Sequence, residues 1–264
     1  MEDLSHYNPE GSVLRRAQMR MVEILDAFVE ICDRHNIKYW LACGTLLGAR
    51  RHKGFIPWDD DLDVYVMQKD YDKLLLILQK ELLEQFKLQA RGTDKNYWHY
   101  HTKIRDTKSC FHYKSKKGDN LQYKGIFIDI FPIEPLPSVG FKKFIDKFLF
   151  SEIHFITAKS LYHKIKYKLM LSFLPIIRFL IMLTRFYYKH IGSKKEYNYA
   201  YGIFFYATFN VENFYPVSEI MFEGKRYKCP GNVDAYLTDN FDSNFMVIPK
   251  PEERTIHSAK IEFL

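Results

Sequence analysis

The segment Trp58-Asp59-Asp60-Asp61-Leu62-Asp63-Val64-Tyr65-Val66 places four carboxylates in five positions and then becomes apolar. In a β-strand the side chains alternate between two faces. Asp59, Asp61 and Asp63 would therefore share one face, opposite an apolar face that can be buried in a core. Like charges about 7 Å apart repel, and each raises the pKa of its neighbours unless a cation neutralises them. A hard divalent ion prefers carboxylate oxygens, so the segment predicts a metal site, with a solvated acidic loop as the alternative.

The residues just before this segment predict a phosphate-binding turn. Tyr39 to Cys43 has the pattern of a short buried strand, Gly44 and Thr45 form a turn, and a short helix follows that ends in basic residues. Glycine lets the backbone approach a ligand closely, and the amides of a helix N-terminus can bind phosphate. Thr45 would add a hydroxyl donor, or would serve only as a helix N-cap.

A further acidic position lies in an apolar strand, Gly125-Ile126-Phe127-Ile128-Asp129-Ile130-Phe131-Pro132. An unpaired carboxylate in such a strand would cost several kcal/mol. Asp129 therefore needs a partner, either an Arg or Lys in a structural role or a metal in a functional one. Together with Asp61 and Asp63, it favours the metal.

The block from Gly44 through Asp59-Asp60-Asp61-Leu62-Asp63-Val64 resembles the LicD family, which includes bacterial phosphorylcholine transferases and fukutin-type proteins of the nucleotidyltransferase-fold superfamily. The resemblance continues from Gly125 to Pro132. It resumes near the C-terminus at Pro216, Phe222-Glu223-Gly224, Pro230, Tyr236-Leu237, Pro249 and His257. Residues 239–242 and 250–254 depart from the expected pattern, which leaves the choice of acceptor open.

The resemblance implies an α+β, nucleotidyltransferase-like fold with a small mixed β-sheet flanked by helices. It also implies that Asp61, Asp63 and Asp129 hold one or two Mg²⁺ or Mn²⁺ ions, with Asp59 as a further ligand or as the base that activates the acceptor. The implied reaction moves a phospho-alcohol, most often phosphocholine, from a CDP-linked donor such as CDP-choline to a hydroxyl of a cell-surface glycan or lipid-linked saccharide, and releases CMP.

Basic side chains must face the phosphates of such a donor. The candidates are Arg50, Arg51, His52 and Lys53 at the end of the short helix, and Lys103 and Arg105, which alternate along a probable strand and would share a face. For each of them, a solvated surface cation is an equally good interpretation. His99, His101 and His257 are candidates for the acceptor side, and a structural histidine is the alternative for each.

Composition limits the compartment and the partners. The 264 residues include 39 Lys and Arg against 32 Asp and Glu, a net charge of +7 that favours acidic partners such as nucleotides or anionic lipid. The four cysteines are far apart and show no metal-ligand spacing, which favours reduced thiols. No secretory signal follows Met1. We therefore expect a cytoplasmic protein with peripheral contact at the inner face of the membrane.

The chain divides into three predicted parts: a catalytic core over 1–140, a helical insertion over 141–200, and a C-terminal segment over 201–264 that completes the active-site cleft. Apolar periodicity predicts one helix over residues 12–35 and another from Tyr71 to Phe86. Three prolines after the Asp129 strand mark the first boundary.

The insertion has its own character, because it is rich in apolar, aromatic and lysine residues and has no acid between Glu152 and Glu196. Its most apolar stretch, Leu169 to Leu183, is shorter than the about 20 residues that span a bilayer. Packing on the core and docking on anionic lipid both remain open.

Two other classes of function compete with the phospho-alcohol transferase. A plain nucleotidyltransferase, which would attach NMP from an NTP to a small molecule or RNA, would use the same carboxylates. A non-enzymatic, basic nucleic-acid-binding protein would explain the charge, but the cations are spread along the chain and the acidic strand would repel phosphate, so nucleic acid is not the favoured partner.

Overall fold

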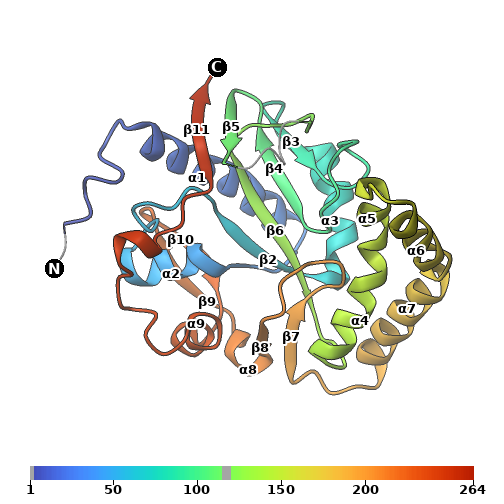
Figure 1. Ribbon diagram of the computed structural model, residues 1–264. Coiled ribbons are helices and arrows are strands. Elements are labelled where there is room, and N and C mark those ends of the chain that lie inside the picture. Colours follow the sequence, from blue (N-terminus) through green and yellow to red (C-terminus); the bar gives the residue numbers. More distant parts are fainter. Residues whose placement is uncertain (1–2, 115–119) are drawn as a thin grey trace.

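The two predicted acidic strands lie side by side in a mixed β-sheet of the computed structural model, which describes residues 3–114 and 120–264 (Figure 1). The sheet runs in the order β1-β2-β6-β4-β3, and β7 pairs with β6 and with β8. Its strands are β1 (Tyr39–Leu41), β2 (Asp63–Met67), β3 (Phe86–Gln89), β4 (Thr102–Asp106), β6 (Phe127–Glu134), β7 (Glu196–Tyr199) and β8 (Thr208–Asn210). The prediction of an α+β fold is confirmed.

Strand register brings the charged residues together. β2 and β6 are parallel, and Asp63 stands opposite Asp129. β4 runs antiparallel to β6 on its other side, where Lys103 stands opposite Asp129. Residues opposite each other on neighbouring strands point to the same face, so Asp63, Asp129 and Lys103 form a row across three strands.

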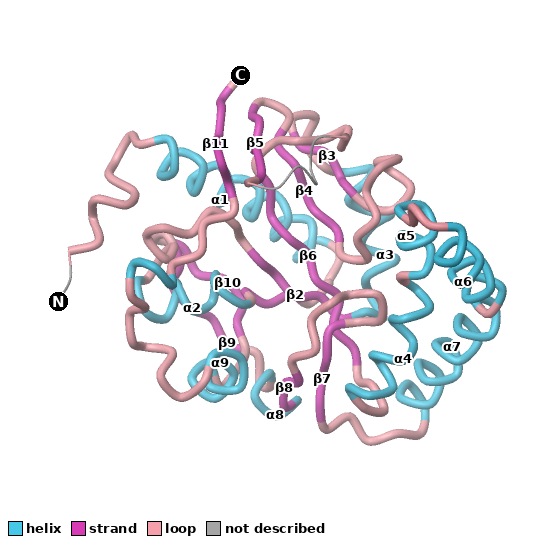
Figure 2. Tube along the Cα trace, viewed as in Figure 1, coloured by secondary structure: helices cyan, strands magenta, loops and turns pink. Residues whose placement is uncertain are grey.

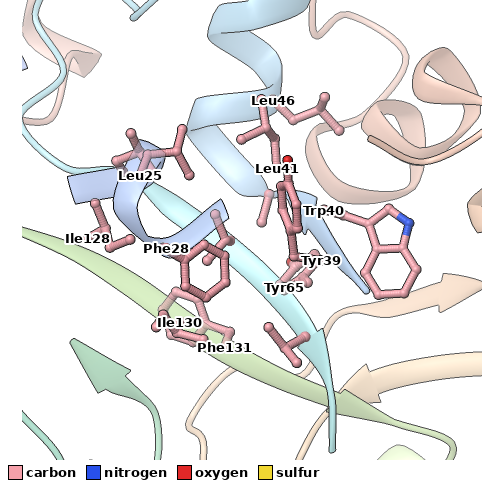
Figure 3. Close-up of a cluster of buried hydrophobic side chains, with 14 of the residues drawn as sticks. Leu25, Phe28, Tyr39, Trp40, Leu41, Leu46, Tyr65, Ile128, Ile130 and Phe131 are labelled. Atoms are coloured by element: carbon pink, nitrogen blue, oxygen red, sulfur yellow. The ribbon is translucent and has the colours of Figure 1, made fainter. Parts of the chain in front are cut away.

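Helices cover the sheet and complete the core. They are α1 (Val13–Arg34), α2 (Cys43–His52), α3 (Gln68–Glu81), α8 (Val211–Phe214) and α9 (Val233–Phe241), besides the helices of the insertion. α1 and α3 contact β6, and α2 contacts β2 and α9. Figure 3 shows Leu25 and Phe28 of α1 lying over Ile128 and Ile130 of β6. These four side chains are fully buried, which is what the apolar stripe of this helix predicts.

Two small hairpin-like sheets attach the C-terminal part to this core. β9 (Ser218–Phe222) pairs with β10 (Lys225–Cys229), and β5 (Ser109–Tyr113) pairs with β11 (Ser258–Phe263). The tube in Figure 2 shows β11 beside β5, so the last strand returns to the first half of the chain. This return places His257, which directly precedes β11, close to the acidic segment.

The structure corrects three of the predicted elements. The acidic strand begins only at Asp63, and residues 59–62 form an extended loop before it. The second helix ends at Glu81 because Leu82 leaves the helical conformation, and Phe86 already begins β3. Gly44 and Thr45 lie inside the first turn of α2 rather than in a turn before it, and the N-cap is Ala42, so Thr45 is not a cap.

The insertion forms a separate layer at the right edge of Figure 1. It consists of α4 (Val139–Leu149), α5 (Ser151–Thr157), α6 (Leu161–Ser172) and α7 (Leu174–His190). Ile145, Leu149 and Ile177 build a second small core there. The helices end at His190, and β7 returns to the central sheet within the range 141–200 that the sequence assigned to the insertion.

Over the described residues, no single helix is both long and apolar enough to cross a membrane, although α6 and α7 taken together, bent by 45° at their junction, have a suitable length and composition.

Candidate functional site

The acidic loop is held in place by its second carboxylate, Asp60, which was not a predicted site residue. Asp60 is fully buried and accepts hydrogen bonds from the backbone N–H of His257 (3.0 Å) and of Ser258 (2.6 Å). The His257 ring lies 3.0 Å from the same carboxylate. These contacts hold the pKa of Asp60 below its usual value although burial alone would raise it. Asp60 therefore anchors the C-terminal segment.

Thr45 and Gly44 fix the start of β2. The Thr45 hydroxyl oxygen accepts a hydrogen bond of 2.8 Å from the backbone N–H of Asp63, and Thr45 is buried. A Cβ added to Gly44 would stand 3.0 Å from a carboxylate oxygen of Asp59, so a larger residue would crowd the acidic loop. Both residues therefore position the carboxylates. Their predicted contact with substrate phosphate stays a prediction.

Asp129 has the cationic partner that its burial demands. The Lys103 ammonium lies 2.6 Å from both carboxylate oxygens, and His101 Nε2 lies 3.3 Å from one of them. Burial tends to raise the pKa of Asp129, but the Lys103 charge and the His101 contact outweigh it and hold that pKa well below its usual range. The structure therefore shows a lysine partner for Asp129, which is the structural alternative.

The other three carboxylates are not neutralised in the same way. Burial and the neighbouring Asp61 raise the pKa of Asp59 well above its usual value. Burial and the charges of Asp61 and Asp129 do the same to Asp63, against the opposing effect of Lys103. Burial also raises the pKa of Asp61, although His257 opposes it. The described side chains thus leave an excess of negative charge at the end of the two parallel strands where Asp63 stands opposite Asp129.

Whether a divalent metal ion fits this site depends on the excess of negative charge and on the types of donor atom present. Within residues 3–114 and 120–264, no three His, Cys, Asp or Glu side chains are grouped closely enough to hold an ion as they lie. The donors are all carboxylate oxygens, which Mg²⁺ and Mn²⁺ prefer. Burial and mutual repulsion raise the pKa of Asp59, Asp61 and Asp63, and a bound cation would oppose that shift. By charge and donor type the residues fit a hard divalent ion. Asp59, Asp61, Asp63 and Asp129 are the groups that would hold it.

The predicted phosphate-binding cations separate into different environments. Arg105 is fully buried and donates to Gln89 Oε1, to the Gly125 carbonyl and to the Tyr113 hydroxyl, so it cannot reach a ligand and the prediction is wrong for this residue. It does share a face with Lys103, as expected, because both cations lie over the Phe127 ring.

The predicted cations at the end of α2 also differ from one another in their partners and exposure. Arg50 is partly exposed and makes a two-pronged ion pair with Asp234 of α9 at 2.7 and 3.1 Å. Arg51 donates to two backbone carbonyls of the C-terminal segment. Burial, with the Arg51 charge beside it, lowers the pKa of His52 to about 4, so His52 is neutral at pH 7. Lys53 is exposed, and its backbone ends the helix in the left-handed conformation.

His257 lies beside the acidic loop, where its Nδ1 is 3.6 Å from Asp61 as well as close to Asp60. The hydrogen bond to Asp60 raises its pKa above 6.5. His99 packs against His101, with ring centroids 4.9 Å apart. Two of the three predicted histidines, His101 and His257, therefore contact a site carboxylate.

A network of hydroxyl and thiol groups behind Asp63 was not predicted. The Tyr65 hydroxyl lies 2.7 Å from that of Tyr199 and 3.1 Å from that of Tyr236, and the Cys43 thiol lies 3.3 Å from Tyr65. Tyr65 is two residues after Asp63 and so points to the same face, which is the sequence feature that could have identified it. Tyr199 and Tyr236 come from distant segments, and no local pattern indicates them.

An aromatic surface continues from the carboxylates along β6. The Phe131 ring lies 4.7 Å from His101, 5.6 Å from Tyr199 and 5.8 Å from Phe205. Phe205 is half exposed, while Phe131 and Tyr199 are buried. Phe205 therefore offers an accessible aromatic face near Asp129.

Carboxylates grouped beside a lysine where two parallel strands pair are residue types that phosphoryl-transfer sites use. The family model described as LicD/FKTN/FKRP, nucleotidyltransferase domain, matches residues 36–167, half of the chain. The protein belongs to this family, as its sequence resemblance indicated.

Individual relatives match over shorter ranges. The lipopolysaccharide cholinephosphotransferase LicD of Haemophilus influenzae is 36% identical over 126 residues, which cover 47% of this chain and 46% of that protein. An uncharacterized protein of Rickettsia prowazekii, RP689, is 55% identical over 77 residues, which cover 29% of this chain and 27% of that protein. The human ribitol 5-phosphate transferase FKRP is 43% identical over 42 residues, which cover 16% of this chain and 8% of that protein. The matched region thus spans less than half the length of each relative.

Proposed function

We propose that this protein is a metal-dependent phospho-alcohol transferase, which moves a phospho-alcohol from a CDP-linked donor to a hydroxyl of a glycan and releases CMP. The observation that carries the proposal is the group of Asp59, Asp61 and Asp63, whose pKa values are raised, beside the Lys103-paired Asp129 of β6. The names of two relatives, a cholinephosphotransferase and a ribitol 5-phosphate transferase, support the class of reaction.

The side chains have distinct roles in this proposal. Asp61, Asp63 and Asp129 would hold one or two Mg²⁺ or Mn²⁺ ions, which would neutralise charge on the donor diphosphate. Lys103, already beside Asp129, places a further positive charge where the CMP phosphate departs. Asp59, a carboxylate whose pKa is raised by burial and by Asp61, takes the proton of the acceptor hydroxyl.

Phosphocholine is the favoured cargo because of the aromatic surface at Phe205. A quaternary ammonium is attracted to the face of an aromatic ring by about 0.5–2 kcal/mol. Trp40 and Trp58 are buried in the core and offer no ring face to such a ligand. Phe205→Ala should therefore raise the KM for CDP-choline about tenfold, within the range that this energy allows, and leave the KM for CDP-ribitol unchanged.

The decisive experiment combines a donor panel with a matched pair of variants. CDP-choline, CDP-ethanolamine, CDP-ribitol, CDP-glycerol and the four NTPs are incubated with Mg²⁺ and a saccharide acceptor, and the release of CMP or pyrophosphate is measured. Asp61→Asn should lower CMP release by about a hundredfold or more, the loss typical of one electrostatic group in an active site. The control Asp234→Asn changes a carboxylate that pairs with Arg50 on the surface and should have little effect.

The panel also separates the competing activity. The family description includes a nucleotidyltransferase domain, and pyrophosphate release from an NTP would establish that second function in place of the first. CMP release that is equal in Asp61→Asn and in the wild-type protein would refute both.

A further inference from the structure

The insertion exposes an apolar stripe that nothing in the described structure covers. α6, which is described throughout, contains no buried residue, and Ile177 is the one buried residue of α7, which is also described throughout. Large apolar side chains recur every three or four residues across both helices and are from 44% to 73% exposed: Leu161, Ile165, Leu169, Ile176, Phe179 and Leu183. That spacing places the first three along one side of α6 and the last three along one side of α7.

The charge around this stripe has a single sign. From residue 153 to residue 195 the chain has nine Lys and Arg and no Asp or Glu. Lys164 and Lys168 each follow a stripe residue by three positions and therefore lie beside it on the exposed surface of α6. A wide apolar stripe flanked by cations is the pattern of a helix that lies in a membrane interface.

A cavity of about 910 Å³ opens next to the stripe, between α7, the start of α3 and the end of β6. Met182 and Phe186 line it and are also exposed, so the cavity wall continues into the apolar surface. Six cations and two carboxylates line the cavity. Arg185 pairs with Glu134. In contrast, Lys69, Arg178, Lys189 and Lys194 make no ion pair with the described residues, and these are charges that phosphate groups would neutralise.

We propose that α6 and α7 dock on an anionic lipid bilayer, with the stripe in the interface and lipid phosphates at the cations of the cavity. Docking does not depend on the transferase proposal, because it uses none of the site carboxylates. A second copy of the chain fits the surface poorly, since a symmetric contact would bring two sets of the same nine cations together. A spanning arrangement would bury Lys164, Lys166 and Lys168 in hydrocarbon, which is costly.

The test measures binding of the full chain to vesicles of phosphatidylcholine alone and of phosphatidylcholine with 30% phosphatidylglycerol. Flotation should show at least tenfold stronger binding to the anionic vesicles, and 0.5 M NaCl should reduce it. Charge reversal by Lys164→Glu and Lys168→Glu together should reduce binding tenfold or more, since each basic residue near an anionic surface contributes about fivefold. The matched control reverses Lys73 and Lys80, two exposed lysines of α3, and should have a much smaller effect.

A second pair of variants tests the stripe itself. Replacing Leu169, Phe179 and Leu183 by Ser should abolish binding, whereas Leu76→Ser with Val247→Ser removes equally exposed apolar groups elsewhere and should not. Because the stripe residues are exposed, the variants should keep the wild-type circular dichroism and melting temperature. Three results would overturn the proposal. They are absence of vesicle binding, an equal loss of binding in the variants and their matched controls, and a wild-type dimer that only the stripe variant dissociates. Resistance of the bound protein to extraction at pH 11 would replace docking by insertion. CMP release with a soluble acceptor is measured alongside, so a failure of docking is distinct from a failure of the catalytic proposal.

Discussion

Asp60 and Asp61 are neighbours in the acidic run, yet the structure gives them opposite effects on stability. Asp60 is buried and accepts two backbone hydrogen bonds and one contact from the His257 ring. Asp61 is 23% exposed and stands among other carboxylates that repel it. The same substitution at each position therefore separates a structural carboxylate from a functional one.

The magnitude follows from the groups left without partners. Asp60→Ala removes the acceptor of the His257 and Ser258 N–H groups, and a buried donor left unsatisfied costs about 1–3 kcal/mol. We expect a loss of about 3 kcal/mol in the free energy of unfolding, or about 6–12 °C in Tm for a chain of this size. Asp61→Ala relieves repulsion and should leave stability within about 1 kcal/mol of the wild type or raise it.

Urea unfolding in EDTA, followed by circular dichroism, measures both values without metal binding as a confounding factor. Asp60→Asn keeps one carbonyl acceptor and should fall between the wild type and Asp60→Ala. Equal losses for Asp60→Ala and Asp61→Ala would refute the division of roles. A loss below about 0.5 kcal/mol for Asp60→Ala, the size of an ordinary surface change, would show that the C-terminal segment is held by other contacts.

Three further predictions concern residues around the carboxylates. Thr45→Val leaves the Asp63 N–H without its acceptor and should cost about 1–2 kcal/mol in urea unfolding, whereas Thr45→Ser should be nearly neutral. The pKa of His257 is raised above its unfolded value of 6.5, so its contribution to stability is complete below pH 6.5 and is lost as pH rises through the folded pKa. Unfolding free energies from pH 6 to pH 9 should show this decline. His257→Gln should make the decline shallower, and the raised pKa values of Asp59, Asp61 and Asp63 should account for what remains. Arg105→Met leaves the buried acceptors of the guanidinium without a donor and should lower the free energy of unfolding by about 3 kcal/mol. The KM for the CDP-alcohol donor should stay unchanged in the folded protein.

The elements that depend on local pattern could be predicted from the sequence. The helix found at Val13–Arg34 was predicted over 12–35 because its apolar stripe is long and regular. Asp129 could be assigned to the site of Asp63 because it interrupts an apolar strand, and such a charge needs a partner. The partner of Asp129, Lys103, was already a candidate, but only strand register shows that the two stand opposite each other.

The features that the sequence patterns did not reveal depend on long-range packing. Arg105 has the same charge and alternation as Lys103, but the Gln89 and Tyr113 side chains close over it, which no local pattern reveals. The anchoring role of Asp60 depends on residues 197 and 198 positions later in the chain.

The two proposed sites lie at opposite ends of the same pair of strands, which suggests how they would cooperate. Asp63 and Asp129 stand at one end of the paired segment of β2 and β6, and Met67 and Ile133, which line the cavity, stand opposite each other at the other end. Four residues of strand correspond to about 13 Å. An acceptor anchored by a lipid phosphate in the cavity would therefore receive the phospho-alcohol on a hydroxyl at a distance from its anchor. A water-soluble donor would approach from the half-exposed side of His257 and Asp61. In this proposed arrangement the insertion would select the acceptor and the carboxylates would perform the transfer, which would explain why α6 and α7, which contain no Asp or Glu, accompany an acidic site.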